Sequence, residues 1–223
     1  SEHEVKNHLM IQKQKFIVNN EKVGYVAKKE FLPFILGEKN AYSNRVEESY
    51  FENITRKDVV DFFQTRYNHQ PFEIFVSGKV GEKSLEVIDT IFSSVRVDSP
   101  YLLKPFFEID SSEQSTMLIE KEDAIQSAIR VGNVSIGRQH KDFPKLYLAN
   151  TLLGGYFGSR LMNNIREDKG YTYGIGSGLI SMKHLAYFVI STEVGSEVTN
   201  NTLYEIELEM NKMCDELVNE KEL

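Results

Sequence analysis

The chain has 223 residues, of which 41% are hydrophobic and 26% are charged, so its composition is that of a globular protein and not of a disordered or fibrous one. A formal net charge of −7, with no long basic run, argues against a nucleic-acid-binding surface and favours proteins, peptides or small molecules as partners. Cys214 is the single cysteine, which excludes an internal disulfide and a cysteine-rich metal site.

The sequence shows neither a membrane-spanning run nor a signal-peptide pattern. No apolar run approaches the roughly 20 residues of a membrane-spanning helix. The polar start, SEHEVKNHLM, has no signal-peptide pattern, and its first residue is serine, so we expect a segment of a longer protein. The sequence indicates no cellular compartment.

The first part of the chain has a helical pattern. Apolar residues recur at helical spacing over residues 5–35, with an interruption at Asn19 and Asn20, which predicts one or two helices. Thr55 stands three residues before Asp58, the spacing of a capping box, and so predicts the start of a further helix. We expect this helix to be buried through Val59, Phe62 and Phe63 and to end before Pro71.

A strand and a linker are predicted next. Residues 72–79, in FEIFVSGKV, are β-branched and aromatic and predict a strand, and Leu85, Ile88 and Phe92 then share one face of a helix. Residues 96–112 contain two prolines and no periodicity, which predicts a linker between two parts of the chain.

The second part mixes strands and helices. The segments 115–122 and 126–136 predict strands, and residues 142–153 predict a helix with Pro144 in its first turn. A second amphipathic helix is predicted from Phe157, Leu161 and Ile165, followed by antiparallel strands over 171–181 and 185–194 and a last helix from Leu203 to Leu217. This order favours an α+β fold, a two-layer α/β sandwich with a largely antiparallel sheet.

A metal site within the chain is not indicated by its histidines. His3 and His8 are five residues apart and point away from each other on a helix, so they cannot act as an i, i+4 pair. Glu4 and His8 share a face, but zinc needs three or four ligands. The other histidines, His69, His140 and His184, have no acidic neighbour at ligand spacing. The GIGSG run lies in a strand pattern and is therefore not a phosphate loop.

Arg166 and Tyr173 stand where a helix gives way to a strand. Gly170, between them, suits the left-handed stop of a helix. In one interpretation the two residues are structural, with Arg166 favouring the negative end of the helix dipole and Tyr173 packing on a sheet. In the other, both face a cleft and donate hydrogen bonds to a substrate backbone or a developing oxyanion. The residues alone leave both interpretations open.

A wider set of motifs resembles a known family. LLGGYFGSRLMNNIREDKGYTYGIGS, with its Gly-Gly turn, Ser-Arg-Leu helix and Arg-x6-Tyr pair, closely resembles the C-terminal domain signature of the M16 metallopeptidases, the inverzincin family of pitrilysin, insulin-degrading enzyme and the mitochondrial processing peptidases. Residues 31–68 and the run AIRVGNVSIG resemble further segments of that family. The resemblance covers most of the chain and implies the fold type of the LuxS and M16 metallopeptidases.

The resemblance also implies how the chain is divided and what it does. Residues 1–95 would end one M16-like half, 96–112 would link the halves, and 113–223 would begin the second half. Arg166 and Tyr173 match the family's pair and would act as catalytic and substrate-binding residues, holding the peptide and steadying the oxyanion. The family's H-x-x-E-H zinc motif is absent from this chain. Glu2 or Glu4 could correspond to the family's third ligand, a glutamate.

These implications lead to three alternative functions. In the first, the chain is part of a zinc endopeptidase that acts on a peptide or unfolded protein; zinc is then bound outside it, by an H-x-x-E-H-bearing half in the same polypeptide or in a partner subunit. The chain alone is then expected to be inactive. In the second, it is a non-catalytic, core-subunit-like module that binds peptides or braces an assembly. The third is a self-contained α+β binding module.

Overall fold

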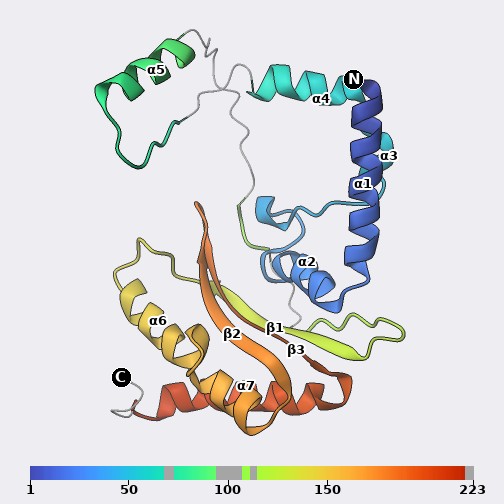
Figure 1. The fold of residues 1–223 in the computed structure, drawn as a ribbon. Helices are drawn as coiled ribbons and strands as arrows, with labels where there is room; N and C mark the ends of the chain where they lie inside the picture. Colours follow the sequence, from blue (N-terminus) through green and yellow to red (C-terminus); the bar gives the residue numbers. More distant parts are fainter. Residues whose placement is uncertain (68–72, 94–106, 111–114, 219–223) are drawn as a thin grey trace. The chain divides into compact units, whose positions relative to one another are not determined.

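The computed structural model describes residues 1–67, 73–93, 107–110 and 115–218 (Figure 1). The chain forms two compact units, the first from residues 1–16 and 46–104 and the second from residues 17–45 and 105–223. The linker predicted over 96–112 lies outside the described residues except for 107–110, so the predicted boundaries of the two halves stay a prediction.

The first unit is helical in its described residues. Helix α1 (Glu2–Asn20) begins in this unit and ends in the second. The other helices are α3 (Tyr50–Asn53), α4 (Arg56–Phe62), the wide turn η2 (Phe63–Tyr67) and α5 (Glu82–Phe92). The predicted capping box is confirmed, since the Thr55 hydroxyl accepts from the Asp58 amide while the Asp58 carboxylate accepts from the Thr55 amide. Pro71 lies outside the described residues.

Two predictions for this unit are wrong. Val59, Phe62 and Phe63, expected to be buried, are 46%, 59% and 55% exposed. The described residues of the predicted strand, 73–79, are in no strand, and Phe75 is 88% exposed. A strand needs a neighbour for its backbone hydrogen bonds, and the described residues of the first unit form helices alone, so there is neither a ladder to join nor a sheet on which α4 can bury its apolar side.

The second unit contains an antiparallel sheet. Its strands in the described residues are β1 (Gln126–Ser135), β2 (Thr172–Ser181) and β3 (Ala186–Gly195), in the order β1-β3-β2. The strands predicted over 126–136, 171–181 and 185–194 are therefore confirmed, as is the α+β class with an antiparallel sheet. The strand predicted over 115–122 is not formed, and Leu118 in it is 80% exposed, because no described strand pairs with it.

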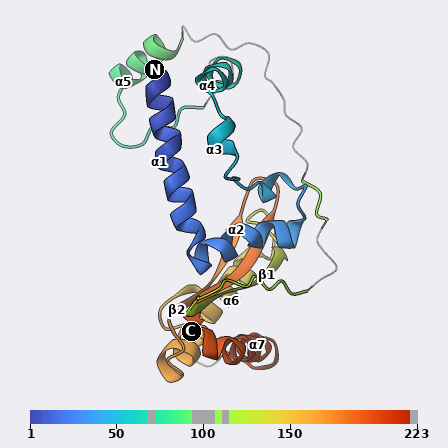
Figure 2. The same cartoon turned by 90° about the vertical axis from the view of Figure 1, so that its right-hand side faces the viewer.

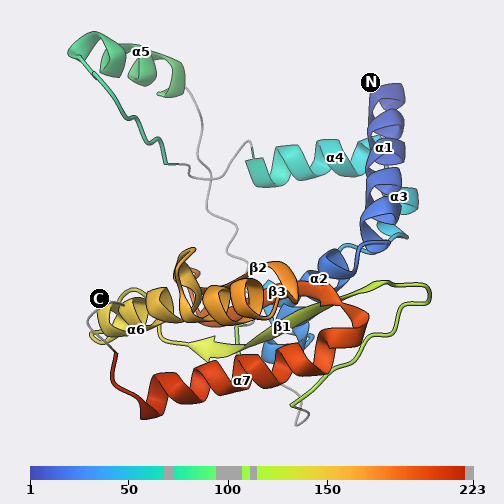
Figure 3. The same ribbon diagram turned by 60° about the horizontal axis from the view of Figure 1, so that its bottom comes forward.

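Helices cover both faces of this sheet. Alternate residues of β3 point to opposite faces, with Ile190 in one buried cluster and Val189 in the other. Helix α2 (Val23–Leu36) packs on the Val189 face through Phe31, Ile35 and Leu36, and Figure 2 shows it beside β1. The segments that follow β1 in the chain pack on the Ile190 face; they are α6 (Phe143–Asn150), η3 (Thr151–Gly155), η4 (Met162–Asp168) and α7 (Thr199–Asp215) (Figure 3).

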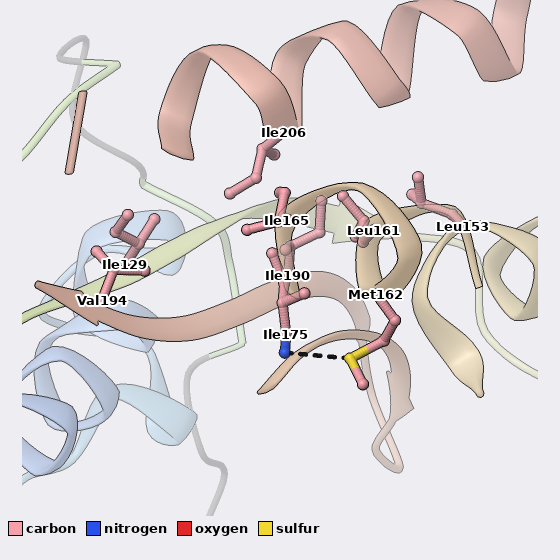
Figure 4. Close-up of a cluster of buried hydrophobic side chains, with 9 residues drawn as sticks. All are labelled: Ile129, Leu153, Leu161, Met162, Ile165, Ile175, Ile190, Val194 and Ile206. Carbon is pink, nitrogen blue, oxygen red and sulfur yellow. Dashed lines mark hydrogen bonds between the residues drawn. The ribbon is translucent and has the colours of Figure 1, made fainter. Parts of the chain in front are cut away.

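The Ile190 face holds the larger core of the molecule's described part. Leu161, Ile165 and Ile190 have no exposed surface, and Ile206 of α7 closes the cluster with 1% exposure (Figure 4). The Ile175 amide of β2 donates to the Met162 sulfur at 3.5 Å, so the helix before β2 is fastened to the sheet at this point.

The helices on this face differ in detail from those predicted. Pro144 does lie in the first turn of α6, but the helix widens into a π-type turn over η3, which contains Gly154 and Gly155. Phe157 precedes the next helix and is 67% exposed, so it is not part of that helix's buried face. Leu217 lies beyond the end of α7 and is 97% exposed. No helix in the described part of the chain has the length and apolar character needed to cross a membrane.

Candidate functional site

The segment between Arg166 and Tyr173 is shaped by a glycine. Gly170 has a φ of 66°, in the left-handed region, which confirms the predicted helix stop. Its amide donates to the Arg166 carbonyl at 3.2 Å, and the Tyr171 amide donates to the Ile165 carbonyl at 3.0 Å. The Gly170 bond spans four residues and the Tyr171 bond spans six. In the Schellman motif the corresponding bonds span three and five residues, and the difference follows from the wide π-type turns of η4.

Arg166 lies in the last turn of η4, with 32% of its side chain exposed. The guanidinium donates to the Glu167 carboxylate at 2.5 Å and lies 4.7 Å from the centre of the Phe157 ring. An ion pair and an aromatic face thus hold it in place. This carboxylate partner is what a structural Arg166 would have, although one hydrogen bond leaves other guanidinium donors available.

Tyr173 points outward from the start of β2. It is 95% exposed and lies at a shift of register between Thr172 and Ile175, an irregularity of the kind that turns a side chain away from its strand. The Thr172 hydroxyl lies 2.7 Å from the Glu193 carbonyl oxygen and accepts from the Gly174 amide at 3.1 Å. Thr192 joins this network, with its hydroxyl 2.9 Å from that of Thr172. The bulge that presents Tyr173 is therefore held by hydroxyl groups.

Tyr173 also lines a cavity of about 390 Å³ in the second unit. The cavity takes its walls from the first turn of α2 and from one end of all three strands. The charged and hydroxyl-bearing residues that line it are Arg130, Thr172, Tyr173, Ser191, Thr192 and Glu193. Arg166 does not line it.

Arg130 supplies the positive charge of this cavity. The strand register aligns it with Ser191 of β3, which is aligned in turn with Gly176 of β2. Its guanidinium lies 6.0 Å from the centre of the Phe31 ring. Within the described part of the chain Arg130 has no ion pair and no hydrogen bond from its side chain. Burial lowers the pKa of Arg130, against the opposing influence of Tyr187 and Glu193.

Glu193 supplies the negative charge and is turned toward α2. A Cβ placed on Gly24, in the first turn of α2, would lie 2.0 Å from Glu193 Oε1, so the carboxylate, the flexible end of an exposed side chain, lies against this turn beside Gly24. Glu193 is exposed and forms no ion pair with Arg130, although the two residues sit diagonally on neighbouring strands. The two opposite charges thus line one cavity without neutralising each other.

Sequence reasoning missed both of these residues. Arg130 and Glu193 come together through the pairing of β1 with β3, which joins segments about 60 residues apart, and no local pattern encodes that register. One signal was present in the run AIRVG. Arg130 shares one face of this strand with the alanine and the glycine of the run, and a charged residue on a strand that is covered on both faces is unusual.

The described residues of this chain do not fit a zinc ion. No group of three or more His, Cys, Asp or Glu side chains that could hold a metal exists within the described residues. His184 stacks on Phe107 with ring centres 4.1 Å apart, and the His140 ring accepts from the Asp142 amide at 3.2 Å. Glu2 and Glu4 lie exposed in the first turn of α1, and His69 lies outside the described residues.

Comparison with known proteins gives a consistent result. Residues 53–223 match the pattern of the family described as "Peptidase M16 inactive domain". A curated relative from Bacillus subtilis (strain 168), named "Probable inactive metalloprotease YmfF", is 26% identical over 145 residues, covering 64% of this chain and 34% of the relative.

Two crystal structures resemble the whole chain. One is the peptidase M16 inactive domain from Pseudomonas fluorescens, with a TM-score of 0.80 and 23% identity over 100% of this chain and 53% of that one. The other is a protease from Helicobacter pylori, with a TM-score of 0.84 and 17% identity over 100% of this chain and 55% of that one. The chain spans about a third to about half of the length of these proteins.

Proposed function

The chain belongs to the M16 peptidase inactive-domain family, and we propose that it is the half without zinc of a longer zinc metallopeptidase, where it holds the peptide substrate and stabilises the oxyanion. The zinc would be bound by an H-x-x-E-H-bearing half, in the same polypeptide or in a partner subunit, because this sequence has no H-x-x-E-H motif and its described side chains offer no suitable ligand set. The substrate would be a peptide or an unfolded protein.

The observation that carries this proposal is the presentation of Tyr173. Tyr173 is 95% exposed, lies beside a cavity and stands on a bulge that hydroxyl groups hold in place. Exposure of a large aromatic side chain gains no packing energy within the chain. Its phenol is free to donate a hydrogen bond to a substrate carbonyl, and more strongly to the oxyanion that develops as that carbonyl is attacked.

Arg166 would act beside Tyr173 as a second donor. The Glu167 carboxylate and the Phe157 ring hold its guanidinium at the end of η4, and the donors that Glu167 does not use remain for the substrate. In this arrangement Glu167 and Phe157 are positioning residues, and Arg166 and Tyr173 are the catalytic and substrate-binding residues.

The curated relative supports a second candidate function. Because that relative is named as an inactive metalloprotease, the whole protein could instead be a non-catalytic module that binds peptides or braces an assembly. An H-x-x-E-H motif in the rest of the protein or in a neighbouring gene favours the peptidase, and its absence from both favours the module.

The test is cleavage of an unstructured peptide by the full-length protein with its H-x-x-E-H-bearing half. We expect Arg166→Ala and Tyr173→Phe each to slow turnover by about 10²–10³, since each removes one transition-state donor. The thermal midpoint should hardly change, because both side chains are at the surface or close to it.

Matched controls are Arg138→Ala and Tyr204→Phe, which alter exposed residues of the same types that do not line the cavity. Both should keep normal turnover. A large drop in the thermal midpoint of the Arg166 and Tyr173 variants, with unchanged turnover per folded molecule, would return both residues to a structural role.

A further inference from the structure

We propose that the cavity beside Tyr173 is a subsite that binds a carboxylate of the peptide, with Arg130 as the anion-binding residue. The proposal rests on the proposed function, since it assumes that a peptide lies over Tyr173, and adds to it the kind of residue that the peptide carries. The cavity volume, about 390 Å³, falls in the range of about 300–1,000 Å³ that is typical of ligand pockets.

The first argument is the state of the Arg130 side chain. A half-buried guanidinium is normally paired with a carboxylate, because burial of its charge is otherwise unfavourable. Among the described residues Arg130 has no such partner, and its guanidinium lies against the Phe31 ring while the residue lines the cavity. The planar guanidinium can form two parallel hydrogen bonds with a carboxylate, so a peptide carboxylate is the ligand that satisfies its donors and its charge.

The second argument is the placement of Glu193. This residue is the natural partner for Arg130 within the sheet, since the two are diagonal neighbours on one face. Instead its carboxylate lies against Gly24 at the start of α2. The guanidinium is thereby left free, and the cavity has an anion-binding wall and an opposite wall that accepts hydrogen bonds from a peptide amide or a basic group.

The third argument is the floor of the cavity. Gly174 has no atom within 4 Å of the position of an added Cβ, and it lines the cavity together with Ser191, the residue of β3 aligned with Arg130. Backbone of an extended peptide can therefore approach closely, while Tyr173 stands at the rim. A residue bound in the cavity would lie next to the peptide bond that Tyr173 contacts.

The test measures peptide binding to the full-length protein with zinc removed by a chelator, so that no cleavage occurs. Fluorescence anisotropy compares a labelled peptide that contains Glu with its Gln counterpart, each with a free or an amidated C-terminus. We expect Arg130→Gln to weaken binding of a carboxylate-bearing peptide on the order of tenfold, the loss of one charge-assisted contact, and to leave the fully amidated Gln peptide unaffected.

The four peptides separate the two sources of the carboxylate. If the Arg130 effect follows the Glu side chain, the subsite takes an acidic residue; if it follows the free C-terminus, the subsite takes the chain end. Either result supports the subsite. An equal effect on all four peptides, or no effect on any, overturns it.

Two further variants protect the test from a folding artefact. Arg138→Gln removes the same charge from an exposed position of the same unit and should leave all four affinities unchanged. Glu193→Gln removes the negative charge of the cavity and should tighten binding of the carboxylate-bearing peptides by a factor of about 2 to 5, which misfolding could not produce. Weaker or unchanged binding in Glu193→Gln would count against the subsite.

Failure of the subsite is distinct from failure of the proposed function. If the wild-type protein binds all four peptides equally well, the subsite is wrong and peptide binding stands. If it binds none of the four peptides, the proposed function is wrong, and the subsite falls with it.

Discussion

At the scale of single residues, the two candidate substrate contacts are held in different ways. Arg166 already has a carboxylate partner and an aromatic neighbour, whereas the phenol of Tyr173 is almost fully exposed on a strand that is half-buried along most of its length. The proposed function therefore makes a stronger demand on Arg166, whose guanidinium must contact substrate while it is bonded to Glu167. Both depend on the chain reversal at Gly170, which ends η4 and starts β2.

Gly170 gives a prediction about stability. In Gly170→Ala the new Cβ meets no atom within 4 Å, so the whole effect comes from the left-handed backbone, with a φ of 66°. We expect a loss of about 1–2 kcal/mol in the free energy of unfolding, measured by urea denaturation of the full-length protein.

Gly174→Ala is the matched control for this prediction. It also has open space around the added Cβ, but its φ is outside the left-handed region, and it should change the free energy of unfolding by less than about 0.5 kcal/mol. Equal losses in the two variants would mean that the backbone at Gly170 is not the cause.

At the scale of elements, the junction of η4 with α7 depends on two buried carboxylates. The Asn164 amide donates to Glu205 at 3.0 Å and to Glu209 at 2.7 Å, and the two carboxylates are only 8% and 4% exposed. Lys169 lies 3.1 Å from Glu205, and Lys212 lies 2.8 Å from Glu209. This network fixes η4, which carries Arg166 in its last turn, to the last helix of the unit.

The network predicts a pH dependence of stability. The Asn164 hydrogen bond, and then that of Lys169, hold the pKa of Glu205 below its ordinary value of 4.5. A carboxylate with a lowered pKa stabilises the fold above the pKa of the unfolded chain, so this stability is lost as the pH falls below about 4.5. In Asn164→Ala the unfolding free energy at neutral pH should drop by about 1–3 kcal/mol and should fall less steeply in acid.

The neighbouring Asn163 is the control for this pH dependence. Its exposed side chain donates to the Gly158 carbonyl at 3.0 Å and touches neither carboxylate. Asn163→Ala should keep the wild-type acid profile, with thermal or urea unfolding recorded between pH 3 and pH 7 for all three proteins. An unchanged profile in Asn164→Ala would show that Glu205 owes its low pKa to another group.

The elements also show how far sequence reasoning reached. The strands after Gly170 and the helix around Ile206 were predicted because their apolar periodicity is local and each packs on a neighbour within this chain. Residues 73–79 have equally good strand composition, yet no described neighbour pairs with them, so composition alone misled. The wide turn of η3 was missed because π-type turns leave no spacing signal in five residues.

The candidate site divides in the same way. Arg166 and Tyr173 were singled out because they lie seven residues apart in one continuous motif, and their role stays a prediction. Arg130, Glu193 and Gly24 were missed because they come from three elements that meet only through the strand register and the packing of α2. Apart from the position of Arg130 among small residues in AIRVG, no local pattern marks a residue whose role arises from tertiary pairing.

At the scale of the whole molecule, the two units differ in completeness. The second has a sheet with both faces covered and side chains that are fully buried. In the first, large apolar side chains such as Phe62, Phe63 and Phe75 are more than half exposed. Exposed apolar surface of this kind is typical of protein contacts, so under the proposed function we expect the rest of the longer protein to cover it.

The last prediction concerns zinc and the 223-residue chain by itself. Hydrolysis by zinc requires three protein ligands around one ion with a position open for water. The described histidines are far from forming such a set, since His3 bonds to Asn7, His140 caps a turn at Asp142, and His184 stacks on Phe107. We expect the chain alone, with added Zn²⁺, to leave an unstructured peptide uncleaved in an assay that detects single hydrolysed bonds by mass spectrometry.

The control for this prediction is the full-length protein with its H-x-x-E-H-bearing half, which should cleave the same peptide and should lose that activity when a chelator removes the metal. Circular dichroism of the isolated chain must show its helices, so that inactivity is not confused with unfolding. Chelator-sensitive cleavage by the chain alone would place a zinc site in this sequence. The division of roles between the two halves would then be wrong. So would the assignment of Arg166 and Tyr173 as residues that act on a substrate whose zinc is bound by the other half.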